Sequence, residues 1–308
     1  MRVIAIVGPT ATGKSALGIE LAEKIGGEII SCDSMQVYKG MDIGTAKATK
    51  EEMKKIPHHM IDIIEPDINF SCADYSLLAT EAVNDITERG KTPIFVGGTG
   101  LYLDSVIEIG SFCDTSRDEN YRAELERYAK ENGNGALHDL LFSVDKKSAA
   151  EIHENNVKRV IRALEIYKCT GVPKSVWDEK SKFAPPPYDA TVIYLTYSDR
   201  ELLYKKIDAR VDKMINDGLV SEVQSLYGKG YLRGNDTASG AIGYKEIVSY
   251  IEGNCSLDEA TEQIKSSTRK YAKRQITWFS RKKNYNKIYV DTENVRECVD
   301  KILGGING

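Results

Sequence analysis

The stretch VGPTATGKSA, residues 7–16, decides the fold predicted for this chain. Gly8 to Ser15 follows the pattern G-x-x-x-x-G-K-[ST], whose glycines let backbone N–H groups face inward at the N-terminus of a helix. Such a loop binds a diphosphate or triphosphate, with Lys14 neutralising phosphate charge and the Ser15 hydroxyl as the expected Mg²⁺ ligand. The predicted diphosphate-binding residues are Gly8, Pro9, Thr10, Ala11, Thr12, Gly13, Lys14 and Ser15. The motif alone does not say whose phosphates the loop holds.

The segments around this loop alternate between apolar strands and amphipathic helices. Residues 2–8, 28–34 and 91–97 are short apolar runs typical of buried parallel strands, while residues 14–26 and 75–89 have helical spacing. This alternation predicts an α/β fold, a P-loop NTPase-like parallel sheet flanked by helices. Because ligands gather at the carboxyl ends of such strands, we expect the loop, Asp33 and the turn at residues 97–100 to share one rim of the sheet.

The pattern changes after about residue 116. Three helical segments follow with no convincing strand between them, at residues 117–133, 136–153 and 155–171. A Pro-rich linker, SKFAPPPYDA, then leads to a return strand at residues 191–197, after which the pattern is mostly helical. We therefore predict a P-loop catalytic core made of residues 1–116 and 188–308, with an all-helical insertion at residues 117–187.

Composition restricts the class of protein. The chain has 308 residues, 41% hydrophobic and 29% charged, with a formal net charge of −4, which argues against a uniformly basic nucleic-acid coat. The N-terminus is too short an apolar run for a signal peptide, and no stretch has the length of a transmembrane helix, so we expect a cytoplasmic protein without a membrane partner. The six cysteines are scattered with no CxxC pair, as expected of reduced thiols. Nothing in the sequence demands an obligate protein partner or more than a monomer.

The segment around Asp33 differs from the corresponding segment of a generic ATPase or GTPase. Asp33 ends the second strand in SCDSMQVY, residues 31–38, where a Met-Gln-aromatic segment follows the acid. Two interpretations are open from the local pattern: a helix N-cap or metal-binding acid, and a general base beside a phosphate leaving group. Thr99, in GGTGLY, is expected at the same rim.

A basic segment lies near the C-terminus, at residues 265–284, KSSTRKYAKRQITWFSRKKN. It contains no acid, and Tyr271, Trp278 and Phe279 are interleaved with its cations. Such a stripe on a net-acidic protein is typical of a nucleic-acid contact, while the alternative is a solvated helix face with its aromatics in the core. Lys158, Arg159 and Arg162 form a second, weaker basic cluster within the insertion.

Together these segments resemble one family, the bacterial tRNA dimethylallyltransferases. The resemblance runs through almost the whole chain in the order GPTATGKS, ISCDSMQVYKGMDIGTAK, PHHMID, FVGGTGLY, RALEIY, IDARVDKMINDGLVSEV, AIGYKEI and KYAKRQITWF. It implies transfer of a dimethylallyl group from dimethylallyl diphosphate to N6 of the adenosine 3′ of the anticodon in tRNA. The loop at Gly8–Ser15 would then hold a leaving diphosphate with Mg²⁺, rather than a nucleotide.

The resemblance also implies roles for individual residues. Asp33 is expected to take the proton from the adenine amine, and Thr10, Lys14 and Arg210 are expected at the reacting centre; a helix-surface ion pair is the alternative for Arg210. The base is expected to be flipped into a channel beside Asp33. The residues expected to contact tRNA are Asp33, Ser34, Met35, Gln36, Thr99, Arg122, Lys158, Arg159, Arg162, Lys273 and Arg274.

Some features depart from the family pattern or stay open. Residues 110–114 lack the expected apolar-Pro turn, and Ser239 and Gly240 are smaller than is usual, but neither site is expected to touch the chemistry. His58 and His59 are interpreted as structural or tRNA-facing rather than as metal ligands. Three other functions remain as alternatives: a prenyltransferase acting on free adenine nucleotides, a P-loop kinase, and a non-catalytic RNA-binding module.

Overall fold

The computed structural model describes residues 1–108, 118–182, 185–234 and 237–304. The chain divides into two compact units, one made of Met1–Val106 with Tyr188–Gly308 and the other of Ile107–Pro187. The predicted core–insertion boundary at residues 116 and 117 and the unusual segment 110–114 lie outside the described residues.

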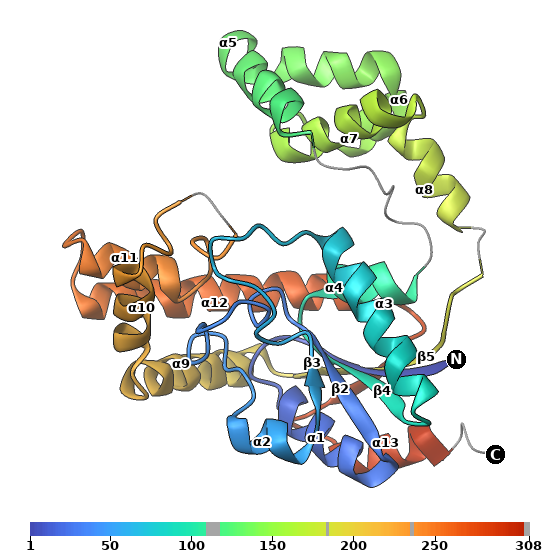
Figure 1. The fold of residues 1–308 in the computed structure, drawn as a ribbon, viewed down its shortest axis with the longest axis vertical. Coiled ribbons are helices and arrows are strands. Elements are labelled where there is room, and N and C mark those ends of the chain that lie inside the picture. The colour runs from blue at the N-terminus through green and yellow to red at the C-terminus, as the bar shows by residue number, and fades with distance from the viewer. Residues whose placement is uncertain (109–117, 183–184, 235–236, 305–308) are drawn as a thin grey trace. The chain divides into compact units, whose positions relative to one another are not determined.

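The first unit is built on a six-stranded parallel sheet with the order β3-β2-β4-β1-β5-β6 (Figure 1). Its strands are β1 (Arg2–Val7), β2 (Gly27–Cys32), β3 (His58–His59), β4 (Thr92–Gly97), β5 (Asp189–Thr196) and β6 (Asn286–Tyr289). β1 is central, with Ile4 opposite Ile94 of β4 and Thr191 of β5. The predicted P-loop-like α/β class is thus confirmed, but β3 and β6 were not anticipated, because strands of two and four residues carry almost no periodic signal.

Helices cover both faces of the sheet. Ile4, Ile6 and Ile94 face α1 (Lys14–Ile25) and α13 (Val295–Gly304), and Leu17 and Val299 pack against that face from the two helices. The opposite face is covered by α3 (Cys72–Glu88), α4 (Gly100–Ile107) and α12 (Leu257–Phe279) (Figure 1). The short α2 (Lys50–Lys55) precedes β3. The strands are therefore buried on both sides, as the continuous apolar runs predicted.

A second hydrophobic core joins the carboxyl-end loops of the sheet to the later helices. These are α9 (Arg200–Asn216), α10 (Leu219–Gly228), α11 (Tyr244–Ile251) and α12. Val37, Tyr38 and Met41, which follow β2, are buried against Val211 of α9 and Ile264 of α12. The segment after β2 is therefore fixed against α9 and α12, the two helices that carry Arg210 and the basic stripe.

Within its described residues the second unit has helices and no strand: α5 (Glu119–Val144), α6 (Lys146–Glu151), α7 (Val157–Thr170) and α8 (Lys174–Lys182). Gly133, at φ 88°, kinks α5, and Asp145 separates α5 from α6 by accepting the Ser148 amide. The segment predicted as one helix over residues 136–153 is therefore two, and α8 occupies a stretch for which no helix was predicted. Among the described residues, no helix combines the length and the apolarity needed to cross a membrane.

Candidate active site

The loop between β1 and α1 has the shape of an anion-binding nest. Gly8, at φ 146°, passes so close to β5 that an added Cβ would lie 2.1 Å from the Leu195 carbonyl oxygen. Gly13 is left-handed at φ 82° and starts α1, whose N-terminal amides and dipole favour a bound anion. The Thr12 hydroxyl donates to the Pro9 carbonyl oxygen at 2.9 Å, which ties the two halves of the loop together.

Lys14 folds back onto its own loop. Its ammonium donates to the Pro9 carbonyl oxygen at 2.6 Å, and it lines the same cavity as Ser15. Burial, with the nearby charge of Arg210, lowers the pKa of Lys14 to about 7, while Asp33 acts in the opposite direction. Because burial disfavours the charged form of Lys14, a bound anion would stabilise that form and raise the pKa.

Asp33 directly follows β2, at the rim where the phosphate loop also lies. Its Oδ1 accepts the Met35 amide at 2.9 Å in a turn, so the carboxylate closes a turn and does not cap a helix. Burial raises the pKa of Asp33, and the Met35 hydrogen bond, Lys14 and Arg210 work against that increase. The result is a carboxylate that is more basic than a surface aspartate yet faces two cations.

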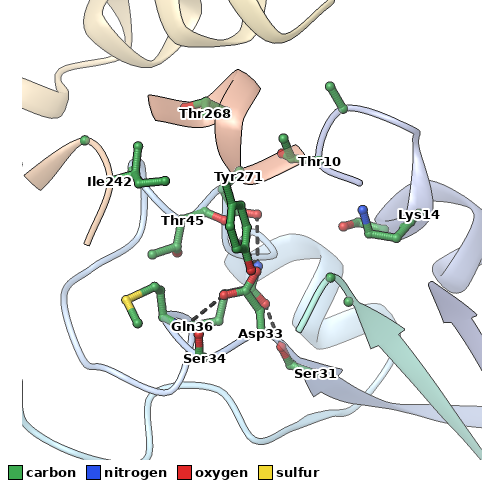
Figure 2. A pocket seen from close by; sticks show the side chains of 18 of the residues that line it. Thr10, Lys14, Ser31, Asp33, Ser34, Gln36, Thr45, Ile242, Thr268 and Tyr271 are labelled. Carbon is green, nitrogen blue, oxygen red and sulfur yellow. Dashed lines mark hydrogen bonds between the residues drawn. The ribbon is translucent and has the colours of Figure 1, made fainter. Parts of the chain in front are cut away.

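These groups line a single cavity of about 420 Å³ (Figure 2). Thr10, Lys14, Ser15, Asp33 and Arg210 all line it, although they come from the phosphate loop, the end of β2 and α9. Figure 2 shows Asp33 facing the open space, with Thr10 and Lys14 on one side and Gln36 and Thr45 on the other. Arg210 lines this cavity and is half-buried. Burial lowers the pKa of Arg210, and the charge of Asp33 opposes this.

The segment after Asp33 forms one wall. Ser34, Met35 and Gln36 line the cavity, but the Gln36 amide is engaged within the protein, with Ser31 at 2.7 Å and the Thr45 carbonyl oxygen at 3.3 Å. The Thr99 hydroxyl accepts the Ser34 amide at 3.1 Å, which joins the turn after β4 to this wall. Gln36 and Thr99 therefore shape the wall, and their contacts with tRNA stay predictions.

The cations of the insertion divide into two kinds. Arg122 makes two 2.7 Å hydrogen bonds to Glu165, and Arg162 reaches the same carboxylate at 2.6 Å. Glu165 is fully buried, so both arginines neutralise a charge inside the second unit. Lys158 and Arg159 are exposed on α7. The phosphate contacts predicted for these four residues stay predictions.

The basic stripe on α12 divides in the same way. Arg269 bonds Asp208 at 2.6 Å, and Lys265 lies 2.8 Å from Asp212, so these two cations join α12 to α9. Lys273 and Arg274, the two predicted to bind tRNA, are exposed, and Arg274 also lines the cavity and lies over the ring of Tyr271. The stripe is therefore divided. Lys265 and Arg269 are used in ion pairs within the protein, and Lys273 and Arg274 are exposed.

The site fits Mg²⁺ only if the substrate brings most of the ligands. Among the described residues no group of three or more His, Cys, Asp or Glu side chains is arranged to hold a metal ion. Mg²⁺ commonly keeps several waters and binds substrate phosphates with few protein ligands, and Ser15 supplies a hydroxyl at the cavity wall. His59 bonds the buried Glu28 at 2.8 Å, as a structural residue does, and His58 lines the cavity.

Tyr271 and Gln275 line the cavity from α12, and the sequence prediction gave neither a place in the active site. Figure 2 shows the ring of Tyr271 beside Asp33, and Gln275 follows one helical turn further along α12. Their four-residue spacing places them on one helix face, but the sequence alone predicted Tyr271 only as an aromatic among the cations of the basic stripe. Gly240 also lines the cavity, and the expectation that this departure does not touch the chemistry stays a prediction.

Comparisons with known proteins agree with this geometry. Residues 36–283 match the family model described as IPP transferase. A tRNA dimethylallyltransferase of Caldanaerobacter subterraneus subsp. tengcongensis is 48% identical over 310 residues, covering 99% of this chain and 98% of the relative. That of Geobacillus thermodenitrificans is 53% identical over 278 residues, covering 90% and 87%.

Solved structures give the same result. The full-length tRNA isopentenylpyrophosphate transferase of Bacillus halodurans has a TM-score of 0.72 at 45% identity, covering 99% of this chain and 96% of that one. A eukaryotic dimethylallyltransferase acting on tRNA has a TM-score of 0.83 at 30% identity, covering 99% and 79%.

A parallel α/β sheet, a phosphate loop and a charged cavity at one rim define the class of proteins with a P-loop-like α/β fold. The relatives that are 48% and 53% identical, over 99% and 90% of this chain, narrow this class to one family. The chain belongs to the IPP transferase family, among the bacterial tRNA dimethylallyltransferases, and is a prenyltransferase.

Proposed function

We propose that the chain transfers the dimethylallyl group of dimethylallyl diphosphate to N6 of the adenosine 3′ of the anticodon in tRNA, releasing diphosphate. The observation that carries the proposal is the shared cavity of Asp33, Lys14 and Arg210. A base and two cations around one space are what attack by an amine and departure of a diphosphate require.

The reaction assigns each group a step. The adenine N6 attacks C1 of the donor, and the bond from C1 to the bridging oxygen breaks, so the electron pair and negative charge pass to the diphosphate. Amides of the loop at Gly8–Ser15, with Lys14 and Arg210, stabilise that charge. Asp33 accepts the proton that N6 loses; its raised pKa makes it a better base than a surface carboxylate. Thr10, a residue of the loop, lines the cavity, and we place it beside the reacting centre.

Mg²⁺ would be held by the Ser15 hydroxyl and by diphosphate oxygens. When bound, it neutralises charge on the leaving group. The protein's own part is to fix the diphosphate at the helix N-terminus and to keep Lys14 and Arg210 beside it.

The acceptor is an RNA loop whose adenosine is turned out of its stack. A cavity of about 420 Å³ is large enough for a base beside a five-carbon group, and enzymes that modify bases take them out of the stack. Ser34, Met35 and Gln36 form the wall against which we place the base. Lys273 and Arg274 in the first unit, and Lys158 and Arg159 in the second, are exposed cations to which we assign contacts with tRNA phosphates.

The names of the relatives favour this acceptor over the alternatives. The proteins from Caldanaerobacter and Geobacillus are tRNA dimethylallyltransferases, and the eukaryotic structure is of an enzyme acting on tRNA. We place the enzyme in the cytoplasm, with no membrane and no obligate protein partner.

The test supplies labelled dimethylallyl diphosphate with unmodified tRNA or with AMP, and in parallel measures hydrolysis of ATP. The proposal expects label in tRNA that depends on Mg²⁺, and no ATP turnover. Label in AMP but not in tRNA would make the chain a prenyltransferase of free nucleotides. ATP turnover without prenyl transfer would make it a kinase or ATPase.

A further inference from the structure

Gln275, on α12, is bonded to two strand-end loops at once. Its Oε1 accepts the Thr10 amide of the phosphate loop at 3.0 Å, and its Nε2 donates to the Gly98 carbonyl oxygen after β4 at 3.0 Å. The side chain is only 5% exposed, so neither bond is readily exchanged for water. The carboxamide thus uses one acceptor and one donor, in a fixed orientation, at the edge of the cavity.

The bond to Thr10 determines which backbone amides of the phosphate loop can bind the diphosphate. Because the Thr10 amide is already donated to Gln275, it is not available to the diphosphate, and the nest is made by the amides that follow. The neighbouring Ala11 has a left-handed φ of 65°, unusual for a residue with a Cβ, and its carbonyl oxygen accepts the Tyr197 hydroxyl at 3.3 Å. The apex of the loop is therefore held from outside, by Gln275 at Thr10 and by Tyr197 at Ala11.

The bond to the Gly98 carbonyl oxygen explains why position 98 is a glycine. A Cβ at Gly98 would lie 2.1 Å from the Gln275 Nε2, so this position has no room for a side chain while Gln275 occupies its place. Gly98 lies next to Thr99, whose hydroxyl holds the amide of Ser34 beside Asp33. One carboxamide thus connects the loop beneath the diphosphate to the turn that supports the base-side wall.

We propose that Gln275 is a positioning residue, which fixes the conformation of the phosphate loop and its separation from the Gly98 turn by bridging Thr10 and Gly98. It touches neither substrate in this role. The inference rests on the proposed function for its kinetic readout, but the bond to the Thr10 amide can be tested without any substrate.

Two substitutions separate the bridge from the volume of the side chain. Gln275→Met keeps the length and the apolar stem but removes both hydrogen bonds, which leaves the part-buried Thr10 amide and the buried Gly98 carbonyl without their partner. Gln275→Glu keeps an acceptor for Thr10, but its ionised form places a second acceptor against the Gly98 carbonyl oxygen. When protonated, the same carboxyl donates to Gly98 and restores both bonds, and burial favours that form.

A matched control comes from the same helix. Trp278 donates its indole N–H to Asp104 at 3.1 Å, so Trp278→Phe removes a part-buried hydrogen bond of α12 that does not reach the phosphate loop. We expect Gln275→Met to lower kcat/KM with dimethylallyl diphosphate by about 10- to 100-fold, as misplaced loops do, and Trp278→Phe to lower it far less. We expect the Thr10 amide proton, slow to exchange in the wild-type enzyme, to exchange rapidly in Gln275→Met alone.

The pH profile gives the sharpest outcome. We take the ratio of the activity of Gln275→Glu to that of the wild type, so that the titration of Asp33, common to both, cancels. This ratio should increase as the pH is lowered from about 8 to about 6. A flat ratio, or a Gln275→Met enzyme equal to Trp278→Phe in both kcat/KM and Thr10 exchange, would overturn the inference. If the wild type itself transfers no dimethylallyl group, the proposed function fails, while the exchange of Thr10 still decides the role of Gln275.

Discussion

At the scale of single residues, burial acts in opposite directions on the two charged groups that face each other in the cavity. It raises the pKa of Asp33 and lowers that of Lys14 to about 7, so each group is closer to losing its charge than it would be in water. Arg210 strengthens the effect on Lys14 and weakens it on Asp33. Such paired shifts are typical of sites where protons and charges move during the reaction.

The role of Asp33 predicts a large loss of turnover with little loss of stability. Asp33→Asn keeps an acceptor for the Met35 amide, so the turn at the cavity rim should persist. We expect the single-turnover rate of transfer to fall by roughly 10²- to 10⁴-fold, the range for a lost general base, with the melting temperature and tRNA affinity nearly unchanged. Near-normal turnover would remove Asp33 from its assigned step.

The depressed pKa of Lys14 predicts proton uptake on binding. At a pH of about 8, above its pKa of about 7, Lys14 is mostly neutral, and a bound diphosphate would raise the pKa and recharge it. Calorimetry in buffers of different ionisation enthalpy should therefore show more protons taken up by the wild type than by Lys14→Arg, whose guanidinium stays charged. Equal proton uptake by the two proteins would contradict the assigned ionisation of Lys14.

At the scale of elements, the cations of α12 divide into those paired with α9 and those that are exposed. Lys265 and Arg269 pair with α9, while Lys273 and Arg274 are exposed further along the helix. The sequence predicted a basic stripe but could not divide it, because the partners Asp208 and Asp212 are more than fifty positions away and approach only once α9 packs against α12.

This division predicts two different effects of neutralising cations. Lys273→Gln with Arg274→Gln should weaken tRNA binding and reduce the slope of log affinity against log salt by about one to two, as lost phosphate contacts do. Lys265→Gln with Arg269→Gln removes the same charge from the same helix but from the pairs with α9, so the slope should change less. Equal slopes for the wild type and the Lys273 and Arg274 variant would make those residues part of a solvated face.

In the insertion, Glu165 links α5 and α7. Burial opposes its ionisation, but hydrogen bonds from Arg122 and Arg162 outweigh that effect and hold the pKa of Glu165 at about 2. Because this value lies below that of an unfolded glutamate, at about 4.3, the stabilisation is complete above about pH 5 and is lost as the pH falls toward 2.

Glu165→Gln should therefore destabilise the protein by about 2–3 kcal/mol near neutral pH, at the low end for a buried pair because both arginines also reach solvent. The effect should shrink in acid. Glu179→Gln, which breaks an exposed pair with Lys147, should cost much less. Chemical denaturation at several pH values measures both, and equal losses would show that the Glu165 cluster does not stabilise the insertion.

At the scale of the whole molecule, most of the sheet and the helices beside it could be predicted from local pattern. The strands that became β1, β2, β4 and β5 and the loop at Gly8–Ser15 lie close to where they were expected, since each is a continuous apolar run ending in glycine or a polar turn. What the pattern could not supply was long-range contact. Gln275 meets Thr10 across 265 positions, and Arg122 meets Glu165 within the insertion, so no local window contains either pair.

The central claim is that one cavity holds the diphosphate of a prenyl donor beside the carboxylate that takes a proton from a tRNA adenosine. Mass spectrometry of nuclease fragments, after unmodified tRNA is incubated with dimethylallyl diphosphate and the enzyme, tests it most directly. We expect N6-dimethylallyl adenosine at the single position 3′ of the anticodon with the wild type, and almost none with Asp33→Asn. Modification at other positions, or equal modification by Asp33→Asn, would contradict it.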